Sequence, residues 1–335
     1  MDVLIVTQSE IPGLLPMSEC IDVMDATLRA LAEGKAILPL RQMTALPGGQ
    51  GLLAVMPSYL GPIDAPGVKV ITVFPGNEGT EIDSHQGAVL LFEGSRGRLL
   101  AVMDATAITA IRTAAVSGVA TRALAREDAG DLAILGSGTQ AHTHLEAMLA
   151  VRPVRRVRVW SRTAEHARQF AERESERHGI TVEVAGSGRE AVDGADLICT
   201  TTSSRVAVLA GAWVAEGAHV NAAGFAGPTG RELDAEMVAR ARLFADRRES
   251  VLKESGDFVL AREEGLVSDD HVAGELGEVL LGAVPGRTAP DQITLFESQG
   301  LAIEDVASAH HIYRSAERLG AGTRVALGGL HHAET

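Results

Sequence analysis

The sequence predicts an α/β protein with a doubly wound (Rossmann) dinucleotide-binding domain and a smaller α+β domain. Apolar strands alternate with helices from residue 131 onward, and a glycine-rich turn follows the first of these strands. Short strands punctuated by Gly and Pro fill the preceding part of the chain. Alternating strands and helices build a parallel sheet with helices on both faces, which predicts the larger domain.

The first part of the chain, up to about residue 115, carries the strands of the smaller domain. The apolar runs GLLAVMPSYL, GVKVITVFPGN and AVLLFEGSRGRLLAVMDA are bounded by turns, and EGSRGR within the last run predicts a hairpin loop. A helix is expected over residues 17–33, and a second helix, rich in small residues, over residues 108–126.

The doubly wound region is expected over residues 116–300. Its predicted strands are DLAILGSG, VRRVRVWSR, ITVEVAG, DLICTTT, AHVNAAG and RLFADR. The run RPVRRVRVWSR alternates Arg with Val, which predicts a strand with one solvated face rather than a patch for anions. A long helix follows in SQGLAIEDVASAHHIYRSAERLG.

Composition excludes several classes of partner. The formal net charge of -14 argues against binding to nucleic acid or to an anionic membrane, since both need clustered Lys and Arg. Cys20 and Cys199 are too few and too far apart for a disulfide framework or a metal cluster. The N-terminus lacks a signal-peptide pattern, and no run of 18 apolar residues occurs. We therefore expect a cytoplasmic protein.

The turn in LAILGSGTQA carries the strongest motif. Gly136, Gly138 and Ala141 match the pattern G-x-G-x-x-G/A, between a predicted strand and a predicted helix. In this motif the first Gly allows the tight turn and the second lets the backbone approach a pyrophosphate, while the third position packs the helix closely. The helix N-terminus faces the phosphates. The motif predicts a dinucleotide site.

The end of the second strand indicates which dinucleotide is bound. NAD sites usually place Asp or Glu there, whereas this chain has Ser161, Arg162 and Thr163. Arg can stack on adenine and pair with a 2′-phosphate, so we predict NADP(H), the alternative being a surface arginine near a helix start. Thr200, Thr201 and Thr202 follow another strand, where they either contact the ribose or nicotinamide or form a satisfied turn.

The chain also resembles the ornithine cyclodeaminase/mu-crystallin family over almost its full length. The stretches that carry the resemblance are PLRQ (39–42), GVKVITVFPGN (67–77), TAIRTAAVSGVAT (109–121), ILGSGTQA (134–141), NAAG…REL (221–233), LKESGD (252–257), ELGEV (275–279) and SQGLAIEDVA (298–307). The family includes cyclodeaminases, alanine dehydrogenases and reductases of cyclic imino acids. The resemblance implies a homodimer, in which residues 1–115 plus 301–335 form the substrate-binding and dimerisation domain and residues 116–300 bind NADP.

The resemblance also implies roles for individual residues. Arg41 matches an arginine that holds the substrate carboxylate, Lys69 the lysine beside it, and Arg112 an arginine near cofactor and substrate. Ser84, with His85, matches a position near the nicotinamide. The resemblance further implies cofactor binding by Thr139 and Gln140 in the phosphate loop and by Asn221, Ala222 and Ser298. It implies substrate binding by Gln299.

One departure from the family pattern decides the predicted chemistry. Cyclodeaminases of the family carry a catalytic aspartate in the loop that reads NAAGFAGPTGREL here, and the alignment places Ala226 at that position. Residues 221–230 contain no titratable side chain. Cyclodeamination needs several proton transfers, whereas reduction of a preformed C=N bond needs one proton, which Lys69 or water can supply.

We therefore expect an NADPH-dependent reductase of Δ1-pyrroline-2-carboxylate or Δ1-piperideine-2-carboxylate, with Lys69 as the catalytic residue. Two alternatives stay open. One is cyclodeamination or alanine dehydrogenation, with an acid from His85 or Glu78; the other is a non-enzymatic NADPH-dependent binding protein. The partner is a small imino or amino acid. No metal is expected, because the pairs His142/His144, His310/His311 and His331/His332 have poor ligand spacing.

Overall fold

The computed structural model describes residues 2–77, 80–224 and 227–327. The chain forms two compact units. Residues 1–112 and 301–335 make up the first unit, and residues 113–300 make up the second. Helix α3 (Ala105–Leu124) crosses the boundary between them. Glu78, Ala226, His331 and His332 lie outside the described residues.

The first unit is an eight-stranded, mostly antiparallel sheet in the order β16-β1-β7-β6-β5-β4-β2, with β3 also paired to β4. Its strands are β1 (Asp2–Val6), β2 (Ala36–Ile37), β3 (Gln42–Ala45), β4 (Leu52–Leu60), β5 (Ala65–Val73), β6 (His85–Phe92), β7 (Leu99–Asp104) and β16 (Thr323–Ala326). Short helix α1 (Ile11–Leu14) and long helices α2 (Met17–Ala32) and α11 (Ala302–Leu319) complete it. The predicted hairpin loop is confirmed, since β6 and β7 pair antiparallel across residues 93–98.

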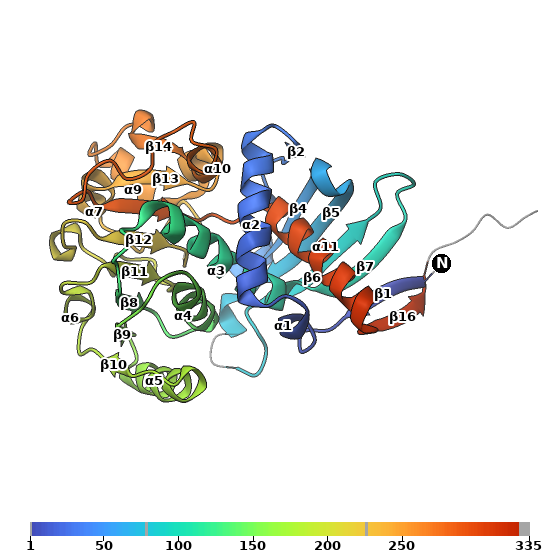
Figure 1. The fold of residues 1–335 in the computed structure, drawn as a ribbon, viewed down its shortest axis with the longest axis horizontal. Coiled ribbons are helices and arrows are strands. Elements are labelled where there is room, and N and C mark those ends of the chain that lie inside the picture. The colour runs from blue at the N-terminus through green and yellow to red at the C-terminus, as the bar shows by residue number, and fades with distance from the viewer. Residues whose placement is uncertain (1, 78–79, 225–226, 328–335) are drawn as a thin grey trace, which may run out of the picture. The chain divides into compact units, whose positions relative to one another are not determined.

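Helix α11 lies against β4, β5, β6 and β7, with α2 beside it, so one face of this sheet is covered by helices (Figure 1). The approach is close at Gly67 of β5, where an added Cβ would lie 2.6 Å from Cγ2 of Val306 on α11. Burial alternates along β5, with Ala65, Gly67 and Lys69 on the covered face. This period of two is the pattern of a strand with one buried face.

The second unit is the predicted doubly wound domain. Its eight strands lie in the order β10-β9-β8-β11-β12-β15-β13-β14, and neighbours run parallel. They are β8 (Asp131–Leu135), β9 (Arg156–Trp160), β10 (Val182–Val184), β11 (Leu197–Thr200), β12 (His219–Ala222), β13 (Arg242–Ala245), β14 (Val272–Glu275) and β15 (Thr294–Glu297). The chain order reverses between β8 and β11, which is the point where such sheets bind ligands.

The connecting segments of this unit are mainly helical. They are α4 (Thr139–Val151), α5 (Ala164–His178), α6 (Gly188–Val192), α7 (Ala235–Arg240), α8 (Arg248–Glu254), α9 (Gly256–Glu263) and α10 (Leu276–Leu280). Short 3₁₀ turns occur at Pro47–Gly49, Gly61–Ile63 and Pro75–Asn77 in the first unit and at Gly211–Trp213 and Asp269–His271 in the second. Strands β11 and β12 are buried at every position, as expected for the centre of a parallel sheet.

Three expectations need correction. The helix expected over residues 108–126 is α3 and begins earlier, at Ala105. The sequence predicts that Lys69 starts a strand, whereas it lies in the middle of β5, which begins at Ala65. The arginine face of strand β9 is only partly solvated, because Arg156 is exposed whereas Arg158 is buried. Its guanidinium donates to Asp131 at 2.6 Å and to the carbonyl of Asp193 at 2.6 Å, so its charge is paired inside the protein.

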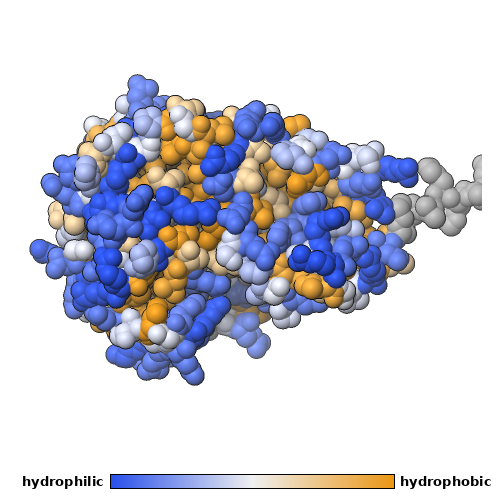
Figure 2. Space-filling model, viewed as in Figure 1, coloured by the Kyte–Doolittle hydropathy of each residue, from blue (hydrophilic) through white to orange (hydrophobic). Residues whose placement is uncertain are grey.

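Hydrophilic residues cover much of the visible face of both units, with hydrophobic patches between them (Figure 2). Exposed large apolar side chains include Ile37, Met43 and Val206. Among the helices in the described part of the chain, none is long and apolar enough to span a membrane.

Candidate active site

Lys69 lies in an apolar row of the first sheet. The register places it between Met56 of β4 and Val89 of β6, with Met103 of β7 beyond. All three neighbours are buried, and the Lys69 side chain is only 2% exposed. A lysine in such a row needs a buried partner, because an unpaired buried charge is costly.

Helix α11 supplies that partner. Asp305 Oδ2 lies 2.9 Å from Lys69 Nζ, and its Oδ1 accepts a hydrogen bond from Arg112 Nε at 3.0 Å. Glu304 Oε2 accepts from Arg112 Nη1 at 2.8 Å. Lys69, Arg112, Glu304 and Asp305 form a group of charges, named here the buried quartet, and both carboxylates are fully buried. The sequence reasoning missed the two acids, although acids inside an otherwise apolar helix face were a visible signal.

The environment of Lys69 changes its basicity. Burial lowers the pKa of Lys69 to about 8, and the positive charges of Arg112 and Arg41 act in the same direction. Asp305 opposes this shift. The Thr109 hydroxyl lies 3.4 Å from Nζ. A lysine with a pKa near 8 is charged at neutral pH and still able to release its proton, which suits a general acid.

The remaining predicted residues of the first unit lie at or just before strand starts and are more exposed than Lys69. Arg41 is half-buried just before β3. Ser84 precedes β6, and its hydroxyl lies 3.1 Å from Nδ1 of His85. Desolvation and the charge of Lys69 lower the pKa of His85. His85 is therefore neutral near pH 7.

The glycine turn of the second unit has the geometry that the motif predicts. Gly136 has φ +120°, and a Cβ there would lie 2.7 Å from the carbonyl oxygen of Thr201. Gly138 caps α4, and a Cβ there would meet nothing within 4 Å. Thr139 and Gln140 open the helix, and Ala141 is fully buried. The turn thus offers open space and backbone N–H groups at a helix start, which fits a pyrophosphate.

The predicted 2′-phosphate residues lie beside this turn. Ser137 donates a hydrogen bond to Ser161 at 3.0 Å, which joins the turn to the end of β9. Arg162 and Thr163 follow and are exposed, and Thr163 caps α5. A cationic side chain thus stands at the end of the second strand.

The threonine run after β11 is held from below by Glu232. This buried carboxylate accepts from Thr200 Oγ1 at 3.0 Å, from both N and Oγ1 of Thr202 at 2.6 Å, and from Gly224 N at 3.0 Å. Thr201 donates to the Leu135 carbonyl. All three hydroxyls therefore donate to acceptors inside the protein, as in the alternative in which these threonines form a satisfied turn. Glu232 also links the ends of β11 and β12.

More acids underlie the same edge of the sheet. Asp257 accepts from the N–H groups of Glu232 and Leu233, and burial together with the charge of Glu232 raises its pKa to about 7. Burial also raises the pKa of Glu297 well above its ordinary value. Asp246 accepts from the N–H groups of Gln299 and Gly300. The sequence reasoning overlooked these acids, although REL, LKESGD and FESQG contain most of them.

The last predicted cofactor residues lie at the ends of β12 and β15. Asn221 is buried, and its side-chain amide donates a hydrogen bond to Thr121 Oγ1 at 3.0 Å. Its side chain therefore bonds to the protein interior. Ala222 ends β12. Ser298 and Gln299 follow β15 and are largely buried. The Ser298 hydroxyl has no hydrogen-bond partner among the described residues.

The two histidines of α4 have structural partners. His142 Nδ1 lies 2.7 Å from Glu174, and buried His144 lies between Ser117 and the Gln140 carbonyl. Within the described ranges, no group of three or more His, Cys, Asp or Glu side chains is placed to hold a metal ion.

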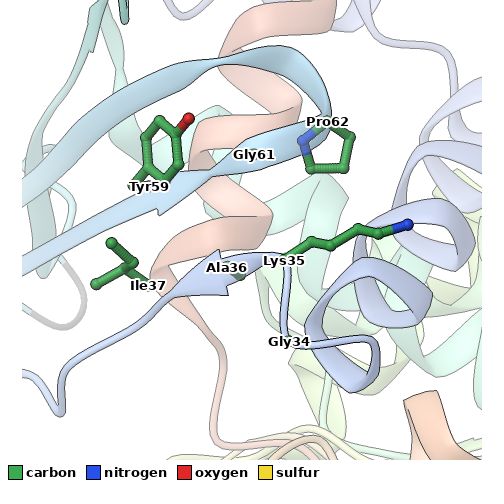
Figure 3. Close-up of a pocket in the computed structure, with 7 residues that line it drawn as sticks. All are labelled: Gly34, Lys35, Ala36, Ile37, Tyr59, Gly61 and Pro62. Atoms are coloured by element: carbon green, nitrogen blue, oxygen red, sulfur yellow. The ribbon is translucent and has the colours of Figure 1, made fainter.

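A surface pocket of about 520 Å³ lies elsewhere in the first unit (Figure 3). It is lined by Gly34, Lys35, Ala36, Ile37, Tyr59, Gly61 and Pro62. None of these is a predicted site residue. Because Lys35 is its one charged lining residue, the pocket lacks the convergent polar groups of an active site.

Comparison with known proteins identifies the family. The model of the ornithine cyclodeaminase/mu-crystallin family matches residues 1–319. The chain belongs to this family. Ketimine reductase mu-crystallin of Mus musculus is 43% identical over 283 residues, which is 84% of this chain and 86% of that protein.

Two solved structures of similar proteins cover almost the whole chain. Thermococcus litoralis Δ1-pyrroline-2-carboxylate reductase, in complex with NADH and L-proline, has a TM-score of 0.94 and 38% identity, covering 96% of this chain and all of that one. An archaeal alanine dehydrogenase dimer with bound NAD has a TM-score of 0.92 and 34% identity, covering 98% of this chain and all of that one. The predicted family and the predicted fold class are both confirmed.

Proposed function

We propose that this protein uses NADPH to reduce the C=N bond of a cyclic imino acid, Δ1-pyrroline-2-carboxylate or Δ1-piperideine-2-carboxylate, to proline or pipecolate. Lys69 carries the proposal, since it is a buried lysine with a pKa of about 8. In addition, the loop formed by residues 221–230 has no titratable side chain. Relatives named as a ketimine reductase and as a Δ1-pyrroline-2-carboxylate reductase that binds proline support the same chemistry.

The chain is an NAD(P)H-dependent oxidoreductase acting on C=N and CH–NH bonds. When bound, the reduced nicotinamide supplies the hydride. Arg41, Arg112 and Lys69 hold the substrate carboxylate by charge-assisted hydrogen bonds. The imine carbon accepts the hydride, the π electrons of the C=N bond move to nitrogen, and nitrogen takes a proton from Lys69 or from water that Lys69 holds. The same groups serve the reverse oxidation, because binding geometry does not set direction.

The choice of NADPH rests on Arg162, with Ser161 and Thr163 beside it. A guanidinium pairs with a 2′-phosphate through two parallel hydrogen bonds, and the end of β9 carries no acid that would repel this group. Gly136, Gly138, Thr139 and Gln140 would hold the pyrophosphate. The rest of the dinucleotide would contact backbone groups or remaining lone pairs of Ser84, Thr200, Thr201, Thr202, Asn221, Ala222 and Ser298. Gln299 would contact the substrate.

We also propose that residues 1–115 plus 301–335 serve substrate binding and dimerisation and that residues 116–300 bind the cofactor. The dimer of the similar archaeal alanine dehydrogenase supports a homodimer. Cys20 and Cys199 are free thiols and buried, which supports a location in the reducing cytoplasm.

The test follows absorbance of the reduced nicotinamide after the purified protein is mixed with chemically generated imine. NADPH and NADH are compared for wild type, Arg162→Ala and Arg168→Ala, the last being an exposed arginine on α5 as a matched control. We expect turnover with NADPH and a KM for NADPH raised about 10–100-fold by Arg162→Ala alone, with KM for NADH unchanged. Equal loss with both cofactors would refute the role of Arg162.

A second arm supplies ornithine with NAD. Formation of proline there, without oxidation of NADPH by either imine, would refute the argument from Ala226 and favour cyclodeamination. Tight NADPH binding without turnover of any substrate would favour the binding-protein alternative.

A further inference from the structure

Asp305 joins the two cations of the buried quartet. Its Oδ2 lies 2.9 Å from Lys69 Nζ, and its Oδ1 accepts a hydrogen bond from Arg112 Nε at 3.0 Å. The exposed fraction is 0% for the Asp305 side chain and 2% for the Lys69 side chain. Because water screens so buried a pair very little, the charge of Asp305 acts strongly on the protonation of Lys69.

The packing of α11 on the sheet sets this contact. Asp305 lies in the first turn of α11, where the helix dipole favours a negative charge. The next residue, Val306, packs against Gly67, which lies two positions before Lys69 on the covered face of β5. A Cβ at Gly67 would lie 2.6 Å from Val306 Cγ2, so a larger residue would push the helix away from the strand. The close approach of α11 therefore brings Asp305 within reach of Lys69.

Stability of the fold does not explain a lysine at this place. Lys69 lies in a row with the buried side chains of Met56, Val89 and Met103. Moving two opposite charges out of water costs about as much as their attraction returns, so an apolar pair of similar size is often at least as stable. The chain nevertheless buries an amine here, which indicates a chemical use for its proton.

The charged and titratable groups that face Lys69 come from several elements. They are Asp305 from α11, Arg112 from α3, Arg41 before β3 and His85 from β6. Burial lowers the pKa of Lys69, Asp305 raises it, and the two arginines lower it. His85 is neutral near pH 7, because desolvation and the charge of Lys69 lower its pKa. Among these groups, Asp305 favours the protonated amine.

We propose that Asp305 is a positioning residue that keeps the Lys69 amine protonated and directed for proton transfer to the imine nitrogen. This inference rests on the proposed function, in which Lys69 is the acid. As the hydride reaches the imine carbon, the π electrons move to nitrogen, an N–H bond of Lys69 breaks and an N–H bond forms on the product. Water then returns a proton to the neutral Lys69 amine. Asp305 stays ionised throughout and acts through Lys69.

The small number of lysines allows a direct measurement. The sequence contains Lys35, Lys69 and Lys253, and the first and last of these are exposed. The full chain, labelled with carbon-13 at the lysine ε-carbon, gives one NMR signal for each lysine, and Lys69→Met identifies the signal of Lys69. The chemical shift of that signal is then followed against pH.

We expect the titration midpoint of Lys69 near pH 8 in wild type and at least about one pH unit lower in Asp305→Asn. Asp305→Glu keeps the charge and should shift the midpoint less than half as far. Asp269→Asn is the matched control, because it removes the same charge from an exposed side chain that pairs with Arg262. It should leave the midpoint of Lys69 unchanged.

The rate profile supplies a second readout, which a loss of packing alone would not move. Because kcat/KM reports the pKa values of the free enzyme, its alkaline limb should move with the midpoint of Lys69. The ratio of the wild-type rate to the Asp305→Asn rate should grow about five- to tenfold between pH 6 and pH 9. A merely structural defect would reduce the rate by the same factor at each pH.

Gly67→Ala tests the same contact without removing a charge, and it decides the question where circular dichroism shows that Asp305→Asn is unfolded. Its methyl group should lift α11 from β5 and lower the midpoint of Lys69. An unchanged midpoint in Asp305→Asn, or in Gly67→Ala where Asp305→Asn is unfolded, would overturn the inference. A rate ratio that stays constant with pH would also overturn it.

The NMR measurement needs no turnover, so the inference and the proposed function fail separately. Reduction of the imine by a protein whose midpoint does not move would refute the role of Asp305 and keep the reductase proposal. A lowered midpoint in a protein that reduces no imine would show that Asp305 holds the charge of Lys69, and it would refute both the reductase proposal and the proton transfer.

Discussion

Glu232 offers a direct test of how the ends of β11 and β12 are held together in the second unit. Substituting Glu232→Ala removes one buried carboxylate that accepts from the N–H groups of Thr202 and Gly224 and from two threonine hydroxyls. The hydroxyls can rotate to other acceptors, whereas the two backbone donors cannot. A buried donor without a partner costs about 1–3 kcal/mol, so the free energy of unfolding should fall by about 2–6 kcal/mol.

Urea unfolding followed by circular dichroism measures this loss, and KM for NADPH measures its effect on the loops. Glu232→Gln keeps one acceptor oxygen and should lose about half as much. Glu216→Ala, at an exposed loop position, is the control and should stay within about 0.5 kcal/mol of wild type. A loss below about 1 kcal/mol for Glu232→Ala, or equal damage by Glu232→Gln, would refute this account of the hydrogen bonds.

Three further predictions follow from the packing. Because the pKa of Lys69 is about 8, its protonated form is lost as pH rises, so kcat/KM should fall above about pH 8; a profile that is flat to pH 10 would contradict its role as acid. Gly67→Ala places a methyl group 2.6 Å from Val306 and should lower the free energy of unfolding by about 1–3 kcal/mol in urea, whereas Gly13→Ala, which meets nothing, should not destabilise. Burial raises the pKa of both Cys20 and Cys199 to about 12, so iodoacetamide at pH 8 should modify neither before urea unfolds the chain, and mass spectrometry would reveal the opposite.

The sequence was most informative where structure depends on near neighbours. Gly136 and Gly138 could be placed at a turn because the preceding strand, the turn and the following helix are contiguous. The hairpin after β6 was likewise predictable, since its turn residues lie between two apolar runs. Strand β9 was found, but the burial of Arg158 was not, because its partner Asp131 comes from another strand.

Long-range partnerships could not be read in this way. In the sequence, Lys69 looks like an ordinary lysine, because its ion-pair partner Asp305 lies 236 positions further along the chain. Strands β14 and β15 were also missed, although both pair with β13 in the parallel sheet. Glu232 and Asp257 lie in motifs that were noticed, and Glu297 directly precedes another, but only the folded sheet shows that these acids underlie one edge.

The pairing of β1 with β16 sets an order for biosynthesis. The first and last described strands are neighbours in one sheet, while residues 113–300 form a continuous compact unit between the two parts of the other. During translation the second unit can therefore be complete while the first unit still lacks α11 and β16. Until those residues emerge, Lys69 has no Asp305 and β1 has an open edge, so a truncated or stalled chain exposes a charged core and a strand ready to aggregate.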